Sequence, residues 1–341
     1  MIATVTLNPS LDEHITVNGL VVDEANRWAR LKRYAGGKGI DVSRAIHEMG
    51  GVTTAYGFIG GPEGRALEIL LDEEGAQFNF TPIEQETRTN FIITDTKTSQ
   101  QTRIDAPGPR ISQKELERFT RKIKNIYPRP DLMVVSGSLP RGIPGNIYYN
   151  IVMEVKRHRV RTILDAERQW LAEGIQAKPY LIKPNIHEAE ELLERELPTE
   201  EAIIKAALDL LEMGIGVVVI SRGKDGIIAA SRKSVVKAVP PPVKVRSAVG
   251  AGDCTVAGLA LKLAHNEPLI EACRLAAAMG TAAVLTSGTE LCHREDVKKL
   301  LPRVLVWELP AKQRTKTKTF SSVNNESVNK ESPSSQPKLI E

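Results

Sequence analysis

Three features that would each point to a particular function are scarce in this sequence. Aromatic residues make up only 4% of the 341 residues, so there are few platforms on which nucleic-acid bases could stack. The three cysteines, Cys254, Cys273 and Cys292, form neither a close pair nor a zinc-ligand spacing. No apolar stretch is long enough to span a membrane, and no basic segment precedes the strand-like residues 2–7. We therefore expect a cytoplasmic protein with reduced thiols and no membrane or nucleic-acid partner.

A strong charge of one sign is also missing from most of the chain. The net charge is +4, from 46 Lys and Arg against 42 Asp and Glu. Residues 311–341 contain six basic and three acidic residues, so the rest of the chain, with 40 and 39, is nearly neutral. The basic excess therefore lies in a tail and does not indicate a nucleic-acid surface. Because this tail is polar and poor in apolar residues, we predict that 311–341 is disordered and that 1–310 is one folded domain.

Within residues 1–310, strand-like and helix-like segments alternate. Short runs rich in Val, Ile and Leu occur at 133–135, 162–164, 180–182 and 217–220. Helical patterns lie before and between them, at 112–126, 186–196 and 200–213. Ser112 with Glu115 three residues later is the signature of a capping box. This alternation predicts an α/β fold, with a parallel sheet buried between two layers of helices.

Two regions break the alternation. Residues 11–35 contain the alternating run 13–17, and residues 87–105 contain two strand-like runs, 89–94 and 101–104, that resemble a hairpin. We expect them to form a small sheet outside the main one. A lid over a site at the edge of the main sheet is the natural use for such a sheet.

The most informative segment is a small-residue loop that enters an apolar helix at 249–260. Gly250, Ala251 and Gly252 would leave backbone amides free at the helix start, where they can hold a phosphate. Asp253 follows, at a position where a carboxylate can accept a proton from an attacking hydroxyl. A base beside an anion hole meets the needs of phosphoryl transfer to an alcohol. Taken alone, the segment favours the simpler explanation that Asp253 only caps the helix.

A second glycine-rich turn enters a helix near the front of the chain. It reads Gly-Gly-Lys-Gly-Ile-Asp over residues 36–41, and Asp12 precedes it where the first strand ends. The chain has no Gly-x-x-x-x-Gly-Lys-Ser/Thr loop, and no dinucleotide fingerprint follows the first strand. The turn is therefore not a known nucleotide loop, and a tight turn with a solvated lysine remains open as its explanation.

Two further segments follow predicted strands. Asn185 and Glu188 are spaced as oxygen ligands of a hydrated magnesium ion, although a helix cap explains the same spacing. The loop 221–226, Ser-Arg-Gly-Lys-Asp-Gly, lies beyond the strand 217–220. It is either a β-turn or a nucleotide-binding loop at the carboxyl end of a strand.

In their order along the chain, these segments resemble the ribokinase-like (PfkB) sugar kinases over roughly residues 1–305. The opening residues 6–12, Thr-Leu-Asn-Pro-Ser-Leu-Asp, resemble the branch that contains 1-phosphofructokinase and tagatose-6-phosphate kinase. Three further segments support the same branch: 57–61, 87–90 and 136–140. The resemblance implies a three-layer α/β/α domain with a small β-sheet lid that is often shared across a homodimer.

The resemblance also implies a role for each segment. Asp253 would be the catalytic base, and the anion hole would consist of Gly250, Ala251 and Gly252. The residues near the sugar would be Asp12, Gly37, Lys38, Asp41 and Arg88. Those that bind ATP would be Asn185, Ser221, Gly223 and Gly280, the last within a helix at 277–284 that walls the adenine pocket. Glu188 and Asn185 would hold Mg²⁺, directly or through water. Arg88 suits an existing phosphate because its planar fork donates two aligned hydrogen bonds.

The activity implied is the transfer of the γ-phosphate of ATP to a hydroxyl of a hexose phosphate, of the fructose 1-phosphate or tagatose 6-phosphate type. Asp41 departs from the pattern, because Asn is usual there. An ionised carboxylate only accepts hydrogen bonds and would repel a phosphorylated sugar. A kinase of an unphosphorylated sugar or a nucleoside therefore stays open. So does a non-catalytic sugar-phosphate sensor, which Asp253, Asn185 and Glu188 together disfavour.

Overall fold

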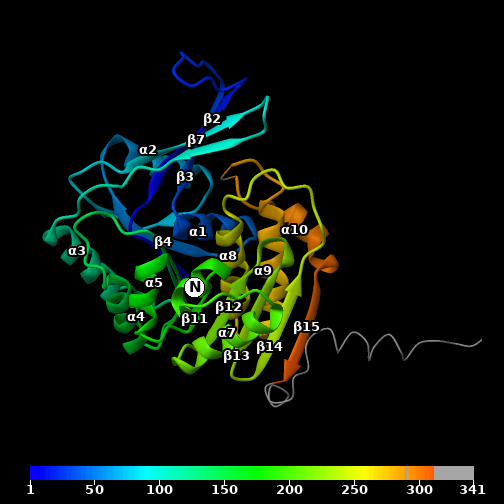
Figure 1. Cartoon of the computed structure of the whole chain (residues 1–341). Helices are drawn as coiled ribbons and strands as arrows, with labels where there is room; N and C mark the ends of the chain where they lie inside the picture. Colours follow the sequence, from blue (N-terminus) through cyan, green and yellow to red (C-terminus); the bar gives the residue numbers. More distant parts are fainter. Residues whose placement is uncertain (289, 311–341) are drawn as a thin grey trace, which may run out of the picture.

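The computed structural model describes residues 1–288 and 290–310, and its largest feature is an eleven-stranded sheet (Figure 1). The strands along its path run in the order β15-β14-β13-β12-β11-β10-β9-β1-β4-β5. The parallel part contains β1 (Ile2–Thr6), β4 (Thr53–Ile59), β5 (Gln77–Phe78), β9 (Leu132–Gly137), β10 (Arg161–Ala166), β11 (Leu181–Ile182) and β12 (Val217–Ser221). A short strand, β6 (Thr81–Pro82), pairs with the end of β4.

The predicted strands all lie in this parallel part. They are buried on both faces, which is why they are near-continuous apolar runs. The sequence prediction did not include the antiparallel extension at one edge. It comprises β13 (Ile227–Ser231), β14 (Ser234–Val239) and β15 (Leu305–Pro310).

Helices cover both faces of the sheet, as predicted. One core lies beneath α3 (Gln113–Lys124), α4 (Ile147–Arg157), α5 (Arg168–Ile175), α6 (Ile186–Leu193) and α7 (Glu200–Glu212). The core on the opposite face lies beneath α1 (Lys38–Glu48), α8 (Ala251–Ala264), α9 (Leu269–Ala283) and α10 (Arg294–Leu300). A smaller third cluster packs around α2 (Gly61–Glu73). Short 3-10 turns lie at η1 (Gly223–Asp225) and η2 (Leu301–Arg303).

The three predicted helices are present, with small differences at their ends. The capping box at Ser112 forms as predicted, and α3 starts at the next residue. The helix predicted for 186–196 ends at Leu193, because Glu194 adopts a left-handed conformation (φ 51°) that closes the helix. The helix predicted for 200–213 ends one residue earlier, at Glu212, and its start is capped by Thr199.

The two off-pattern regions form a separate four-stranded sheet, in the order β3-β2-β7-β8. Its strands are β2 (Ser10–Val17), β3 (Trp28–Gly36), β7 (Arg88–Asp95) and β8 (Gln101–Ile104). It projects away from the main sheet above α1 and the loops that lead to α8 and α10 (Figure 1). The small outer sheet expected from the sequence is therefore present, and we call it the lid.

Among the helices that the structure describes, none is long and apolar enough to cross a membrane. The tail 311–341, predicted to be disordered, lies outside the described residues.

Candidate active site

The start of α8 is an open helix end. Gly250 is its N-cap residue, in a left-handed conformation (φ 78°), and no side chain caps the helix. Asp253 is in the first turn of α8, three residues after the cap, so the simple capping role left open by the sequence is not what the structure shows. Ala251 N lies 3.5 Å from Ala248 O, whereas the amides of Gly252 and Asp253 remain free to bind an anion. The positive end of the helix dipole favours an anion there.

The Asp253 carboxyl lies among opposing charges. Burial raises its pKa, the nearby Asp165 carboxylate raises it further, and the ammonium groups of Lys38 and Lys183 partly offset both, so that its pKa is about 7. A carboxyl with this pKa exchanges its proton near neutral pH. That property is the one a general base needs.

Asp165 and Lys183 were missed in the sequence analysis. Lys183 Nζ lies 3.3 Å from Asp165 Oδ1, and both side chains are almost fully buried. The ammonium also faces the anion hole, because a Cβ atom placed on Gly252 would be 3.7 Å from Lys183 Nζ. A usable signal was present in the sequence, since each is a charged residue at the carboxyl end of an otherwise apolar strand, where α/β proteins bind ligands.

The start of α1 lies across from α8. Gly37 is the N-cap of α1 with φ 117°, and a Cβ atom there would be 2.7 Å from Thr6 Cγ2, so the position requires glycine. Lys38 Nζ contacts Glu167 Oε1 at 2.9 Å. Burial alone would lower the pKa of Lys38, but the carboxylates that surround it, Asp165, Glu167 and Asp253, raise it above its usual value. Lys38 is therefore a fixed positive charge close to the candidate base.

Asp12 reaches the same region from the lid strand β2. Its Oδ1 accepts hydrogen bonds from Ser10 Oγ at 2.7 Å and Asn90 Nδ2 at 3.0 Å. Burial raises the pKa of Asp12, and these two hydrogen bonds oppose that effect. A Cβ atom on Gly36 would lie 2.5 Å from the carboxyl carbon, so glycine at this position leaves room for the Asp12 side chain. Ser10 and Asn90 thus hold Asp12 in one orientation.

Two arginines lie close to Asp12. Arg88 donates from Nη1 to Ala106 O at 2.7 Å and from Nη2 to Asn8 O at 3.0 Å, while its buried Nε has no hydrogen-bond partner among the described residues. Burial lowers the pKa of Arg88, and Asp12 opposes this. Arg103, on β8, was not predicted, yet its charge acts on both Asp12 and Asp253. The lid therefore supplies positive charge to the site.

Asp41 is a buried acid of this region, with 8% of its side chain exposed. Its Oδ1 lies 3.4 Å from Arg44 Nη1. Burial raises the pKa of Asp41 well above its usual value, and the neighbouring Asp253 raises it further. The structure thus brings Asp41 to the site, as predicted, in surroundings that disfavour its charged form.

The residues assigned to the nucleotide lie at the ends of β11 and β12. Asn185 and Glu188 form a reciprocal capping box on α6, with Glu188 N donating to Asn185 Oδ1 at 2.9 Å and Asn185 N donating to Glu188 Oε2 at 2.8 Å. Asn185 also forms a β-bridge with Ser221. Gly223, with φ 58°, opens the 3-10 turn η1 that follows. The start of α6 is therefore in contact with the first residue of the predicted nucleotide loop, 221–226.

The oxygen atoms of Asn185 and Glu188 fit a hydrated magnesium ion. The capping box uses one Glu188 oxygen and leaves Oε1 free of it. Among residues 1–288 and 290–310, no group of three or more His, Cys, Asp or Glu is placed to hold a metal ion. An ion here would therefore take most of its ligands from water and from bound phosphate groups, which is the usual coordination of Mg²⁺.

Gly280 lies on α9 against the first turn of α8. A Cβ atom on Gly280 would be 2.4 Å from Thr255 Oγ1 and 3.1 Å from Ala251 O. The absence of a side chain lets α9 pack closely against the helix that carries the anion hole. This packing accounts for the glycine, and its contact with ATP stays a prediction.

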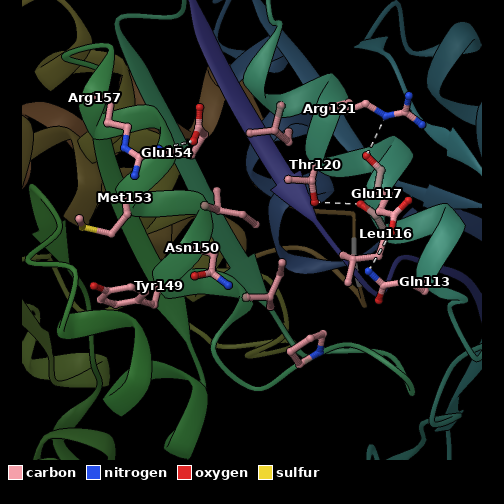
Figure 2. A pocket seen from close by; sticks show the side chains of 14 residues that line it. Gln113, Leu116, Glu117, Thr120, Arg121, Tyr149, Asn150, Met153, Glu154 and Arg157 are labelled. Carbon is pink, nitrogen blue, oxygen red and sulfur yellow. Dashed lines mark hydrogen bonds and ion pairs between the residues drawn. The ribbon is translucent and has the colours of Figure 1, made fainter.

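A groove elsewhere on the molecule shows that size alone does not locate the site. It has a volume of about 850 Å³ and lies between α3 and α4 (Figure 2). Its charged residues include Arg157, which pairs with Glu154 at 3.2 Å, and none of the predicted site residues lines it. The chemically active groups are gathered instead where the parallel strands end.

This chain is similar to several known sugar-phosphate kinases. The chain is 34% identical to 1-phosphofructokinase of Bacillus subtilis, over 91% of this chain and 100% of that protein. It is 33% identical to tagatose-6-phosphate kinase of Staphylococcus epidermidis, over 91% and 100%. The structure of phosphofructokinase-2 from Escherichia coli in complex with substrates and products has 32% sequence identity and a TM-score of 0.85, covering 89% of this chain and 98% of that one.

The family model described as pfkB family carbohydrate kinase matches residues 5–296, which include every residue assigned above to the site. The open start of α8 with Asp253 lies within this match, as do the lid and the two strand ends assigned to the nucleotide. This chain belongs to the pfkB family of carbohydrate kinases.

Proposed function

We propose that this protein is an ATP-dependent kinase that transfers the γ-phosphate of ATP to a hydroxyl of a hexose phosphate. The observation that carries the proposal is the Asp253 carboxyl, with a pKa of about 7, in the uncapped first turn of α8. A base that exchanges its proton near neutral pH and an open anion site belong to one helical turn. Phosphoryl transfer to an alcohol needs both.

In the proposed reaction, Asp253 accepts the proton of the sugar hydroxyl as the hydroxyl oxygen attacks the γ-phosphate. The free amides of the α8 start receive the negative charge of the transferring group. Lys38 and Lys183 add two positive charges on the same side. These groups are held in place before the substrate arrives, because Lys183 is paired with Asp165 and Lys38 with Glu167.

We further propose that Asn185 and Glu188 hold Mg²⁺ through water beside the nucleotide phosphates, and that Ser221, Gly223 and Gly280 contact ATP. Magnesium would supply positive charge to the phosphate oxygens. The bridge between Asn185 and Ser221 supports this arrangement, because it brings the metal residues next to the nucleotide loop. Lid closure over the bound sugar would exclude water and so suppress hydrolysis of ATP.

The proposed sugar carries a phosphate of its own. The lid presents two arginines near Asp12, and one of them, Arg88, has a buried Nε without a partner. A phosphate group would satisfy such a donor. The relatives named for phosphorylated hexoses point the same way. Fructose 1-phosphate and tagatose 6-phosphate are therefore the first candidates, and an unphosphorylated sugar or nucleoside is the alternative.

We also propose that the lid pairs two copies of the chain. In the register of the lid sheet, Ile15, Ile93 and Leu31 share one face, and Phe91 and Ile104 pair on that same face. Phe91 and Ile104 are 36% and 54% exposed. An apolar sheet face of this kind is typical of an interface. Sedimentation equilibrium of the full chain measures the oligomeric state directly, and a strict monomer would contradict this part of the proposal.

The decisive experiment measures ADP release from ATP and Mg²⁺ with a small panel of acceptors. The panel contains fructose 1-phosphate, fructose 6-phosphate, tagatose 6-phosphate, fructose, ribose and adenosine. We expect turnover with a hexose phosphate and none in the absence of an acceptor. Turnover restricted to fructose, ribose or adenosine would move the function to the alternative, and ligand binding without ADP formation would indicate a sensor.

Arg88→Ala separates a phosphorylated substrate from a neutral one. We expect the KM for the sugar phosphate to rise at least about tenfold, since a charge-assisted hydrogen bond is worth roughly 1.5–3 kcal/mol. The KM for ATP should change little. A matched control is Arg110→Ala, because Arg110 is exposed and its side chain is not part of the site. An unchanged KM for the sugar in Arg88→Ala would remove this residue from the phosphate site.

A further inference from the structure

Three acidic side chains meet where the lid, α1 and α8 come together. They are Asp12 from β2, Asp41 from α1 and Asp253 from α8, and the charges of Asp12 and Asp253 both act on Asp41. Only 8% of the Asp41 side chain is exposed. Three carboxylates cannot all stay ionised in so little water unless cations neutralise each of them.

The cation paired with Asp41 is the Arg44 guanidinium, which also forms an ion pair with Glu74. Arg44 donates from Nε to Glu74 Oε2 at 2.6 Å and from Nη2 to Glu74 Oε1 at 2.7 Å, which is a bidentate ion pair. Its Nη1 donates to Ala35 O at 3.1 Å and lies 3.4 Å from Asp41 Oδ1, the longest of these contacts. One guanidinium charge therefore faces two acids, and Glu74 has the better geometry.

Other elements around Asp41 supply little compensation. Arg103, on β8, acts on Asp41, but its Nε is bonded to Asp105 at 2.8 Å. From β3, the ring of Tyr34 lies 5.7 Å from the Arg44 guanidinium carbon. Strands β1, β4 and β9, which also pack against α1, contain no Asp, Glu, Lys, Arg or His. Their one tyrosine, Tyr56, has a pKa that burial raises.

Two charged side chains of β3 contact other acids than Asp41. Lys32 Nζ lies 4.0 Å from Glu290 Oε1, and Arg33 Nε donates to Glu13 Oε1 at 2.9 Å. The charge balance around Asp41 therefore disfavours a carboxylate.

We infer that Asp41 remains a neutral carboxylic acid in the working enzyme and donates a hydrogen bond from its O–H group to a hydroxyl of the bound sugar. This inference rests on the proposed function for the identity of the acceptor. A neutral carboxyl has one donor and one acceptor, as an amide has. It can therefore orient the sugar beside Asp253 without placing negative charge near a phosphorylated substrate. The repulsion expected from the sequence is then absent.

Asp41→Asn tests the inference, because an amide copies the shape and neutrality of the protonated acid. We expect the acid limb of the pH profile, which is set by Asp253, to stay at the same pH, because neither the protonated acid nor the amide carries a charge. If Asp41 were ionised, the substitution would remove a negative charge beside Asp253. The pKa of Asp253 would then fall, and the acid limb would move to lower pH by about half a unit or more. That shift would overturn the inference.

A second measurement does not depend on turnover. The infrared difference spectrum between wild type and Asp41→Asn at pH 7 should contain the C=O stretch of a protonated carboxyl group in the wild type. A carboxylate band in its place would overturn the inference even if both proteins are active. Conversely, a wild-type chain that phosphorylates no sugar would sink the proposed function, while the spectrum would still report the state of Asp41.

Discussion

The helices α6 and α8 cover opposite faces of the main sheet, and their starts are also built in opposite ways. At α6, Asn185 and Glu188 satisfy two backbone amides with their own side chains. At α8, Gly250 provides no cap, and the first amides are left open. A capped helix start is complete in itself, whereas an uncapped one retains hydrogen-bond donors and the positive end of a helix dipole for a ligand. The comparison therefore separates a stabilising helix start from one arranged for catalysis.

Removing the base at the open helix start should have the largest effect. We expect Asp253→Asn to lower kcat by about 10²–10⁴-fold and to spare ATP binding, because the amides stay in place. In the wild type, activity should fall as the pH drops through about 7, since a protonated Asp253 cannot accept a proton. Steady-state kinetics with ATP titration calorimetry checks both expectations. Equal turnover by the variant would end the assignment of the base.

Asp253→Asn should lower activity but raise the stability of the folded chain. The pKa of Asp253 is about 7 in the folded chain and 3.8 for an unperturbed aspartate, so ionising this group disfavours the folded state as the pH rises between these values. The asparagine variant should therefore melt at a higher temperature than the wild type at pH 8, with a smaller difference at pH 4.

A change in the backbone of the open helix start should have the next largest effect. Gly250→Ala places a side chain at φ 78°, with its Cβ atom 2.6 Å from Leu291 Cδ2. We expect a loss of about 1–2 kcal/mol from the left-handed conformation alone, together with a lower kcat because the amides move. Gly145→Ala is the control, since its Cβ would meet nothing within 4 Å. Thermal denaturation and steady-state kinetics measure both effects. Equal melting temperatures and equal kcat values for the two variants would contradict the prediction.

The smallest effect is expected at the capped helix starts. Asn185→Ala and Ser112→Ala each remove an N-cap whose side chain accepts a backbone hydrogen bond. Each should lower the free energy of unfolding by about 1 kcal/mol. Only Asn185→Ala should also raise the Mg²⁺ concentration needed for half-maximal activity, because Ser112 lies on α3, away from the nucleotide. If the two variants have the same magnesium dependence, Asn185 is a helix cap and nothing more.

Local sequence patterns predicted four apolar strands of the parallel sheet, three helices and the lid. Continuous apolar runs predicted the parallel strands, because burial on both faces demands them. The capping box at Ser112 predicted the start of α3. The antiparallel strands β13 to β15 were missed. They make one edge of the sheet, and the last of them is reached only after two long helices, so no local pattern marks their pairing.

The candidate site was only partly visible in the sequence. Asp253 and Gly250 were predicted from their own segment, since a glycine-rich helix start can be recognised from a few neighbouring residues. Asp165 and Lys183 were overlooked, although each lies where an apolar strand ends. Arg103 was not predicted, because nothing in its own segment distinguishes it from the other charged residues of the lid. Their part in the site arises from strands and a lid that are distant in sequence.

The sequence by itself determined the elements, the layer arrangement and the glycines of the two open helix starts, because periodicity, caps and backbone freedom act over a few residues. Only the tertiary structure decided the pKa values and the ion pairs of the site. Burial and the charges of Asp165, Lys38 and Lys183 set the pKa of Asp253, and Asp41 shares the Arg44 guanidinium with the Glu74 carboxylate, which binds it at shorter distances. A charge interacts through space with whatever the fold places beside it, and that cannot be read from its neighbours along the chain.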